Sequence, residues 1–246
     1  MRRLITGDIH ASCTKLKTAL DKAGFSPETD VLYSTGDLAD RGSEVCETFD
    51  YLLSLPHFHP VIGNHDLWLY EYLKIGIHDD SFRNWVKYNG GSITVLALSD
   101  TDYIYRMKIR SLLAKARLAI TEDDFLIVHG GIPEELMDTP VEKLTEITAD
   151  DLILSSQFDP YRKVTWDRTY LMSAVKYEKS KIISQEMMTP LEDERKLFVG
   201  HTPTDGKVFT SEHYRITDMD TGSAKPDGVI SVMDIDTGEV WSSQEK

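Results

Sequence analysis

The stretch Gly36-Asp37-Leu38-Ala39-Asp40-Arg41-Gly42 follows the apolar run Val31-Leu32-Tyr33 and carries most of the information about the fold. Five further polar clusters are spread along the chain: Gly7-Asp8-Ile9-His10, Gly63-Asn64-His65-Asp66, His129-Gly130-Gly131, Trp166-Asp167-Arg168 and Gly200-His201-Thr202. All except the fifth in chain order, residues 166–168, stand at the carboxyl end of a predicted strand. Ligands of open α/β sheets bind outside these strand ends, so we expect the clusters to converge on one face.

The first third of the chain repeats a strand, a polar cluster and a helix. The predicted strands are 4–5, 31–33 and 61–62. Successive clusters are 29 residues (37 minus 8) and 27 residues (64 minus 37) apart, close to the length of a βαβ unit. Apolar residues at helical spacing predict two helices between the strands. In the first helix these residues are Leu16, Ala19, Leu20 and Ala23, and in the second they are Val45, Phe49, Leu52 and Leu53. Ser12 or Thr14 would cap the first helix and Gly24 would end it.

The later sequence predicts further strands and a helical insertion. Short apolar runs at 125–128 and 197–199 are typical of buried strands, and Asp236-Thr237-Gly238 predicts a hairpin turn between 229–235 and 239–241. The aromatic-rich stretch 67–120 is predicted to be mostly helical and to cover or wall the site. With no internal repeat or linker, residues 1–246 are expected to form a single domain.

Composition limits the partners of this chain. The 246 residues are 41% hydrophobic, and 41 acidic against 27 basic residues give a formal charge of −14. A nucleic-acid polymer is therefore not expected as partner, because such partners are held by basic surfaces. No run approaches the ~20 apolar residues that span a bilayer. Two cysteines and a start that reaches a polar cluster early predict a cytoplasmic protein without a signal peptide.

The side chains of the clusters suit metal ions and an anionic substrate. They offer two carboxylates, an amide and three imidazoles, and mixed nitrogen and oxygen ligands favour two divalent ions, Mn²⁺ first and Fe²⁺ or Zn²⁺ as alternatives. Two arginines and a further histidine remain for the substrate. A single cluster could equally be a turn, and residues 166–168 could be a surface turn beside a core tryptophan, but six clusters in order favour a site.

These residues, from Gly7 to Asp220-Thr221-Gly222, resemble the phosphoprotein-phosphatase branch of the calcineurin-like metallophosphoesterases. The match is to bacterial and bacteriophage serine/threonine phosphatases and to the symmetrical diadenosine tetraphosphate hydrolase. The stretch from Asp37 to Gly42 is its most specific part. The resemblance implies an α/β fold, a four-layer α/β/β/α sandwich of two packed mixed sheets flanked by helices.

The resemblance also implies a role for each residue. Asp8 and His10 would hold the first metal ion and Asp37 would bridge both, while the second site would be completed by Asn64, His129 and His201. The proton donor to the leaving oxygen would be His65, oriented by Asp40. Arg41 and Arg168 would clamp the phosphoryl oxygens, and Asn64 and His65 would also contact substrate. A hydroxide held by the two ions would attack phosphorus.

Two departures bear on these implications. Ala11 stands where the family usually has Gly, and alanine favours ordinary φ values, so we expect a slightly different loop. Asp66 stands where many protein phosphatases have Glu, and Asp is familiar in the dinucleotide hydrolases. A serine/threonine phosphatase-like phosphomonoesterase is the predicted function, with a phosphorylated protein, peptide or small phosphoester as substrate. Diadenosine tetraphosphate hydrolysis is the alternative, a catalytically silent phosphate-binding module is a third possibility, and the oligomeric state stays open.

Overall fold

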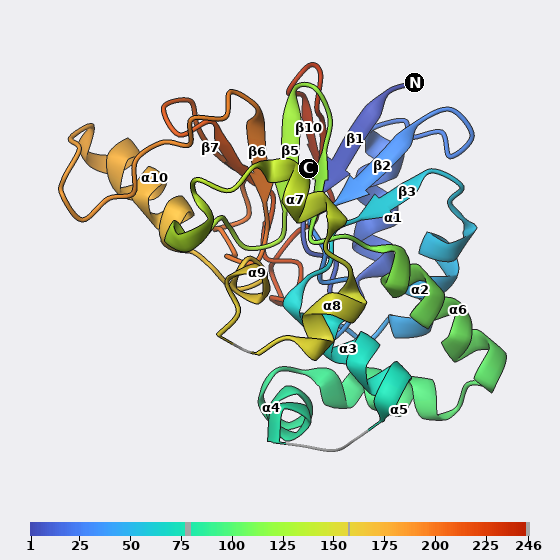
Figure 1. Ribbon diagram of the computed structural model, residues 1–246. Coiled ribbons are helices and arrows are strands. Elements are labelled where there is room, and N and C mark those ends of the chain that lie inside the picture. Colours follow the sequence, from blue (N-terminus) through green and yellow to red (C-terminus); the bar gives the residue numbers. More distant parts are fainter. Residues whose placement is uncertain (77–79, 157, 245–246) are drawn as a thin grey trace.

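The computed structural model describes residues 1–76, 80–156 and 158–244, and its strands form two five-stranded sheets (Figure 1). The first has the order β10-β9-β1-β2-β3 and contains β1 (Arg3–Thr6), β2 (Val31–Ser34), β3 (Phe58–Pro60), β9 (Ser231–Asp234) and β10 (Val240–Ser242). The second has the order β4-β5-β6-β8-β7 and contains β4 (Ala119–Thr121), β5 (Phe125–Val128), β6 (Lys196–Val199), β7 (Phe209–Ser211) and β8 (Ile216–Asp218). Both sheets are mixed. In the first, β1, β2 and β3 are parallel and β9 joins β1 in an antiparallel pair. In the second, the parallel strands β5, β6 and β8 are flanked by antiparallel β4 and β7.

The two sheets pack face to face, because side chains alternate between the two faces of each strand. Ile5 of β1 and Tyr33 of β2 point into a core that they share with Phe125 and Phe198 of the second sheet. Leu4, the neighbour of Ile5, belongs instead to the larger apolar cluster that the helices complete. This arrangement confirms the predicted four-layer sandwich with two mixed sheets.

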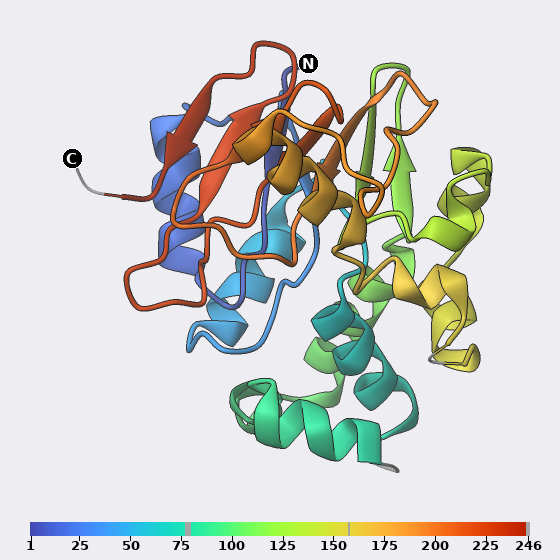
Figure 2. The ribbon, with the colours of Figure 1, turned by 90° about the vertical axis from the view of Figure 1, so that its left-hand side faces the viewer.

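Helices cover the outer faces of the sheets and form a group of their own at one end. Their bounds are α1 (Cys13–Lys22), α2 (Val45–Ser54), α3 (Asn64–Ile75), α4 (Asp80–Tyr88), α5 (Gly91–Ser99), α6 (Tyr103–Lys115), the 3₁₀ helix η1 (Glu134–Leu136), α7 (Val141–Glu146), α8 (Ala149–Leu154), α9 (Pro160–Lys163) and α10 (Thr169–Ser180). Helix α1 contacts β9 and β10, while α7 and α10 contact the second sheet. Figures 1 and 2 show α3 to α6 gathered below the two sheets.

The start of α1 has the predicted position but different bonding. Ser12 stands at the N-cap, yet its hydroxyl donates to the carbonyl of His10 (3.1 Å). The carboxylate of Glu44 instead accepts the backbone N–H of Thr14 (2.9 Å). At the other end Gly24 has a φ of +62° and ends the helix, because glycine adopts this left-handed conformation without a Cβ penalty.

The third strand lies earlier than the sequence predicts. Strand β3 ends at Pro60. The N–H of Val61 still donates to the carbonyl of Ser34 on β2 (3.0 Å), and Val61 forms an isolated bridge to Arg117. The N–H of Ile62 also donates to the carbonyl of Arg117 (2.9 Å). The chain leaves the first sheet here because it pairs with the segment that leads into β4 of the second. Asn64 is thereby brought to the junction of the two sheets. The strands predicted at 125–128 and 197–199 and the hairpin of β9 and β10 are confirmed.

The aromatic-rich stretch 67–120 contains most of α3, the helices α4 to α6 and the start of β4, with residues 77–79 outside the described part. Trp85 is fully buried and packs against Tyr72 and Phe82. Helix α3 begins at Asn64, so the third polar cluster forms the first turn of this helix. The helical group is therefore joined directly to the candidate site.

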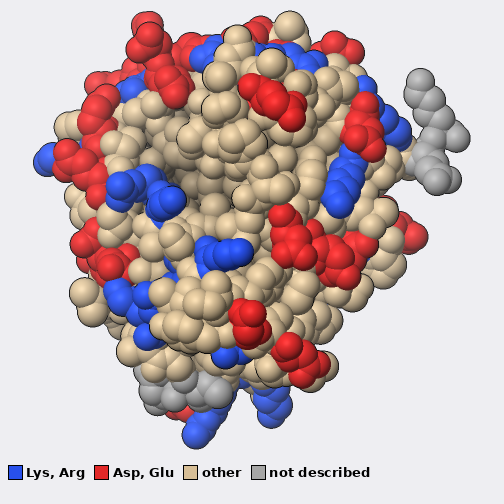
Figure 3. Space-filling model, turned by 90° about the vertical axis from the view of Figure 1, so that its right-hand side faces the viewer, with Lys and Arg blue, Asp and Glu red and all other residues tan. Residues whose placement is uncertain are grey.

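The surface carries both signs of charge. On the face shown in Figure 3, basic side chains are interspersed with acidic ones. None of the helices within residues 1–76, 80–156 and 158–244 is long and apolar enough to cross a membrane.

Candidate active site

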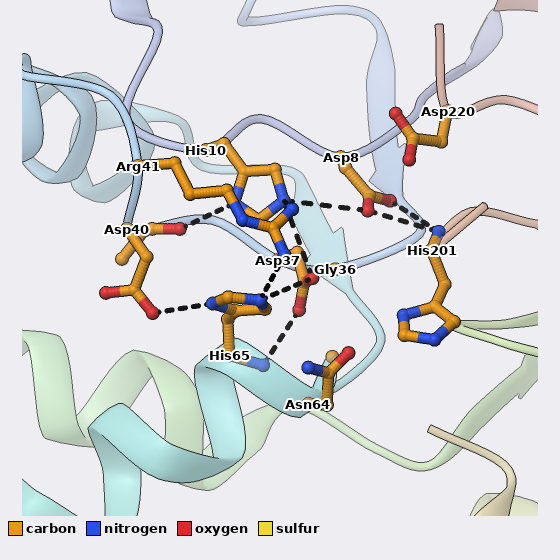
Figure 4. A network of polar contacts seen from close by, with 12 residues as sticks. Asp8, His10, Gly36, Asp37, Asp40, Arg41, Asn64, His65, His201 and Asp220 are labelled. Carbon is orange, nitrogen blue, oxygen red and sulfur yellow. Dashed lines mark hydrogen bonds and ion pairs between the residues drawn. The ribbon is translucent and has the colours of Figure 1, made fainter. Parts of the chain in front are cut away.

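Five of the six clusters meet where the strands of the two sheets end, and Thr35 joins two of their side chains, those of Asp8 and His129. The hydroxyl of Thr35 donates to Oδ1 of Asp8 (3.1 Å), and its carbonyl accepts Nδ1–H of His129 (2.7 Å). The backbone N–H of His201 lies 3.1 Å from both carboxylate oxygens of Asp8. Figure 4 shows residues from α3 and from the loops that follow β1, β2 and β6 pointing toward one another. The convergence predicted from the strand ends is therefore present.

The loops of the site are bent into an uncommon backbone conformation. Positive φ values between 45° and 71° occur at His10, Ala11, Asp37, Asp40, Arg41 and His201. Such conformations cost an L-residue of order 1–2 kcal/mol and concentrate at functional sites. The expectation that Ala11 keeps an ordinary φ is wrong, since its φ is +47°. Backbone hydrogen bonds to Leu38 (2.9 Å) and Glu44 (3.0 Å) hold it there.

Two glycines allow the carboxylates to approach the neighbouring loops. A Cβ on Gly63 would lie 2.1 Å from Oδ1 of Asp37, and a Cβ on Gly200 would lie 2.1 Å from Oδ1 of Asp8. Neither distance is compatible with a side chain. The glycines that begin the third and sixth clusters are therefore required by close packing against Asp37 and Asp8.

The first predicted metal group is formed by Asp8, His10 and Asp37. Nδ1–H of His10 donates to the carbonyl of Ala39 (2.9 Å), so Nε2 is the ring nitrogen that carries the lone pair. That nitrogen lies 3.7 Å from Oδ2 of Asp37 and 3.9 Å from Oδ2 of Asp8. Burial lowers the pKa of His10 to about 3, which keeps the imidazole neutral, as metal binding requires.

The second predicted group is formed by Asp37, Asn64, His129 and His201. Because Nδ1 of His129 donates to a carbonyl, its Nε2 faces Oδ1 of Asn64 (3.0 Å) and Oδ2 of Asp37 (3.4 Å). Ligand atoms of Asp37, His129 and His201 all lie within 4.8 Å of one another. Nε2 of His201 is buried and has no hydrogen-bond partner among the described residues. Burial lowers the pKa of His201 to about 2, so the ring is neutral and one of its nitrogens offers a lone pair.

The donor set fits divalent cations. Lone pairs from Asn64, His129 and Asp37 converge on one region, and lone pairs repel one another unless a positive charge lies between them. Burial opposes a charge on His129, but the carboxylates of Asp37 and Asp8 raise its pKa to about 10. A proton or a metal ion can therefore satisfy the same atoms. Two neutral nitrogens, a carboxylate and an amide oxygen are ligands that Mn²⁺, Fe²⁺ and Zn²⁺ accept.

The pKa values of Asp8 and Asp37 are shifted in opposite directions. Burial and the nearby charge of Asp220 raise the pKa of Asp8 well above its usual range (Figure 4). Burial also disfavours the charge on Asp37, but the imidazoles of His129 and His65 outweigh it and hold the pKa of Asp37 well below its usual range. Asp37 is thus the carboxylate that stays ionised at the centre of the cluster, the position of the predicted bridging ligand.

His65 and Asp40 form the predicted pair. Nδ1–H of His65 donates to Oδ2 of the fully buried Asp40 (2.7 Å). Nε2 of His65 lies 3.9 Å from Oδ2 of Asp37 and 2.9 Å from Nη2 of Arg41. The ligand atoms of His10, Asp37 and His65 also lie within 4.8 Å of one another. Distance alone therefore allows His65 a place among metal ligands as well as the role of proton donor.

The two arginines differ in their surroundings. Arg41 lies between two imidazoles, with Nη1 2.7 Å from Nε2 of His10 and Nη2 2.9 Å from Nε2 of His65 (Figure 4). Arg168 is exposed at the N-cap of α10, and its charge is among the causes, after burial, that lower the pKa of His201. Arg41 thus belongs to the network, whereas Arg168 lies at its margin.

Sequence reasoning missed the roles of Asp66 and Trp166. The carboxylate of Asp66 accepts the backbone N–H groups of Asp37 (2.7 Å), Leu38 (2.9 Å) and Gly63 (3.0 Å), so it fastens the second cluster to the third. Its place inside the third cluster was the only available signal. Trp166 is 41% exposed and meets the ring of His201 edge to face at 5.4 Å, so it is not a core tryptophan.

Comparison with known proteins identifies the family. The model of the calcineurin-like phosphoesterases matches residues 1–230. This chain belongs to that family. This chain is 32% identical over 139 residues to serine/threonine-protein phosphatase 2 of Salmonella typhimurium. It is 33% identical over 135 residues to the symmetrical bis(5'-nucleosyl)-tetraphosphatase of Photorhabdus laumondii. Each match covers 54% of this chain, and the two cover 60% and 45% of the relatives, so the chain matches about half the length of these curated relatives.

A solved structure shows the same fold. This chain superimposes on a cold-active protein tyrosine phosphatase with a TM-score of 0.66. The superposition covers 99% of this chain and 79% of the other. At 16% identity this similarity concerns the fold alone. The resemblance to the calcineurin-like metallophosphoesterases and the fold that it implies are both confirmed.

Proposed function

We propose that this chain is a metal-dependent phosphomonoesterase of the serine/threonine protein phosphatase type. The observation that carries the proposal is the buried His65–Asp40 pair beside Arg41 and Asp37, because it combines a proton donor, an anion-binding cation and a metal-binding carboxylate in one place. Hydrolysis of a phosphate ester needs these three parts.

Two divalent ions are the cofactors we propose, Mn²⁺ first and Fe²⁺ or Zn²⁺ as alternatives. Asp8 and His10 would hold one ion with Asp37, and Asp37 would share the second with Asn64, His129 and His201. When bound, such ions make water acidic and neutralise charge on the phosphoryl oxygens. The backbone carbonyls of Ala39 and Thr35 would keep His10 and His129 in the ligating tautomer, as outer partners of metal-bound histidines commonly do.

His65 would protonate the leaving oxygen. The proton to be transferred belongs on Nε2, the ring atom that faces Arg41 and Asp37, while Nδ1–H stays with Asp40. The buried carboxylate of Asp40 accepts Nδ1–H and fixes the plane of the ring, which is the arrangement of a general acid worth ~10²–10⁴-fold.

Arg41 and Arg168 would bind the phosphoryl oxygens. A guanidinium presents a planar fork of donors that matches phosphate. Arg41 reaches the site from the Asp37 loop and Arg168 from the N-terminus of α10, so the two would approach from different elements. Asn64 and His65 in the first turn of α3 would contact the same phosphoryl group. The partial positive charge at the N-terminus of α3 would also attract the phosphoryl group.

His65→Asn tests this mechanism. We expect the variant to bind Mn²⁺ like the unchanged protein in calorimetric titrations, yet to lose at least about 100-fold in kcat on a phosphoserine peptide. The matched control is His59→Asn, an exposed histidine on β3 outside the site, which should change neither. A near-normal kcat for His65→Asn would remove the acid role. Weaker Mn²⁺ binding would instead make His65 a ligand.

Hydrolysis of dinucleoside polyphosphates is the second candidate function. It is favoured by the similarity to the tetraphosphatase of Photorhabdus laumondii and by Asp66 in the third cluster. The same residues would act on a phosphoanhydride. Turnover of a phosphoserine peptide, p-nitrophenyl phosphate and diadenosine tetraphosphate, each with Mn²⁺, Fe²⁺, Zn²⁺ and Mg²⁺, separates the two. A strong preference for the dinucleotide would overturn the first choice, and no metal-stimulated hydrolysis of any substrate would favour a silent phosphate-binding module.

A further inference from the structure

Asp40 is held by residues of α4 and α5 as well as by His65 of α3. Its Oδ2 accepts Nε1–H of Trp85 (2.5 Å) in addition to Nδ1–H of His65, and its Oδ1 accepts the hydroxyl of Thr94 (2.5 Å). The backbone N–H of Asp40 in turn donates to the oxygen of Thr94 (3.1 Å). Asp40, Trp85 and Thr94 all have zero solvent exposure. The carboxylate therefore has three donors, from α3, α4 and α5.

The segment between Trp85 and Thr94 is packed closely around this carboxylate. A Cβ on Gly91 would lie 2.4–2.6 Å from ring atoms of Trp85, so only glycine lets the indole reach Asp40. Gly90 adopts a φ of +84°, and its carbonyl lies 3.4 Å from the N–H of Arg41. A Cβ at this glycine would lie 2.8 Å from Cγ of Arg41. The turn between α4 and α5 is therefore shaped to the loop that carries Asp40 and Arg41.

Asp40 needs such support because its own backbone is not relaxed. Its φ of +71° lies in the left-handed region, where an L-residue persists only when its surroundings fix it. A carboxylate with one donor can rotate about its Cβ–Cγ bond, and His65 would then lose its fixed ring plane. Donors on both oxygens prevent that rotation. The indole N–H shares Oδ2 with the imidazole and the threonine hydroxyl holds Oδ1, so both oxygens of the carboxylate are fixed.

We propose that Trp85 and Thr94 are positioning residues for proton donation by His65. The inference rests on the proposed function, in which His65 protonates the leaving oxygen. Neither residue touches the phosphoryl group, and both act through Asp40. Their contribution should therefore depend on how much the leaving group needs a proton. A serine alkoxide needs one, whereas a nitrophenolate is stable enough to leave without one.

A purely structural role of the two residues has a different signature. Loss of packing around Trp85 would lower stability and reduce kcat for every substrate by the same factor. Loss of positioning would reduce kcat for the alkyl ester and spare the nitrophenyl ester. The ratio of the two kcat values therefore distinguishes positioning from packing even if a variant is less stable.

The experiment uses Trp85→Phe and Thr94→Val, which keep most of the buried volume and remove only the hydrogen-bond donors. We expect each to lower kcat on a phosphoserine peptide about 10-fold and kcat on p-nitrophenyl phosphate less than about 2-fold, since general acid catalysis as a whole is worth ~10²–10⁴. Thr48→Val is the matched control, because the hydroxyl of Thr48 is equally buried and has no hydrogen-bond partner within the described part of the chain. It should leave both values unchanged.

A second readout does not depend on turnover. In the metal-free protein with ¹⁵N-labelled histidines, Nδ1–H of His65 should give a downfield proton resonance that is protected from solvent exchange by its bond to Asp40. We expect this signal to shift and to exchange faster in Trp85→Phe and Thr94→Val and to stay unchanged in Thr48→Val. An unchanged signal in both variants, or equal losses of kcat on both esters, would overturn the inference.

The two proposals can fail separately. If His65→Asn loses turnover selectively on the alkyl ester while Trp85→Phe and Thr94→Val do not, the acid role stands and the positioning inference is wrong. If His65→Asn shows no leaving-group selectivity, the acid role is wrong, and the inference about proton donation is wrong with it. The resonance of Nδ1–H then reports only whether the two donors hold the ring.

Discussion

The carbonyl of Thr35, at the end of β2, accepts a hydrogen bond from Nδ1 of His129, at the end of β5, over 2.7 Å. The bond joins the two sheets at the candidate site and turns Nε2 of His129 toward Asp37. The hydroxyl of the same threonine donates to Asp8. One residue thus orients a predicted ligand of each metal group, one through its backbone and the other through its side chain.

Thr35→Val separates these two contacts. Valine keeps the carbonyl and the shape but removes the hydroxyl from Asp8, so we expect only the site built on Asp8 and His10 to weaken. Loss of a partner in the outer shell commonly lowers metal affinity about 10–100-fold. Calorimetric titration with Mn²⁺ should show one weakened site and one unchanged site, and Thr48→Val should show two unchanged sites. Equal weakening of both sites, or of neither, would contradict the assignment.

Removal of metal ions should lower thermal stability. Three buried carboxylates, those of Asp8, Asp37 and Asp220, lie close enough to affect one another's pKa, and cations bound there would relieve their repulsion. A ligand at 100 times its Kd stabilises a protein by about 2.7 kcal/mol. One kcal/mol corresponds to about 2–4 °C in a protein of this size. We therefore expect Mn²⁺ to raise Tm by roughly 5–10 °C per ion over the EDTA-treated protein in scanning calorimetry. In Asp37→Asn this rise in Tm should largely disappear. If Mn²⁺ does not change the Tm of the unchanged protein, the proposed metal site is wrong.

The sequence predicted the convergence of the clusters well, for a physical reason. Asp8, Asp37, His129 and His201 each follow a short apolar run, and the carboxyl ends of parallel strands share one edge of a sheet. Strand position was less predictable at Val61, which has the right composition for β3 but pairs with Arg117 on the way to the second sheet. Such a choice depends on a partner far away in the chain, and local pattern does not contain it.

The supporting residues of the site were the least predictable. Nothing in the sequence around Thr94 or Trp85 indicates that both reach Asp40, because the contact spans 54 and 45 residues. The left-handed backbone at Ala11 was also missed, since alanine disfavours that conformation in isolation and tertiary hydrogen bonds impose it. Patterns of residue type thus identify groups that do chemistry, whereas the groups that hold them depend on tertiary packing.

Asp66→Asn should destabilise the protein and weaken metal binding together. The carboxylate accepts three backbone N–H groups, and an amide would turn its own NH₂ toward at least one of them. A buried donor left without an acceptor costs about 1–3 kcal/mol. Urea unfolding should show a loss in that range, and Mn²⁺ titration should show lower affinity because Asp37 and Asn64 lose their common support. Asp151→Asn, in the exposed capping box of α8, is the control and should cost about 1 kcal/mol with unchanged Mn²⁺ binding. If Asp66→Asn behaved like this control, the fastening role would be wrong.

The ion pair between Arg3 and Asp124 should make part of the stability depend on pH. Both guanidinium Nη atoms lie 2.7 Å from the carboxylate oxygens and join β1 of one sheet to the residue before β5 of the other, at the strand ends opposite the site. The Arg3 guanidinium holds the pKa of the Asp124 carboxyl below its usual range. A carboxyl whose folded pKa is depressed stabilises the protein above its unfolded pKa of about 3.9 and loses this contribution as the pH falls through the folded pKa. Because the Asp124 side chain is 52% exposed, solvent screening limits the effect to about 0.2–1 kcal/mol.

Urea unfolding measures this contribution. The free energies of unfolding of the unchanged protein and of Asp124→Asn should differ by this amount at pH 6 and converge below pH of about 4. Asp123→Asn, a substitution of an exposed neighbour, should show no such trend. A difference that stays constant down to pH of about 3 would show that the pair does not carry this pH dependence.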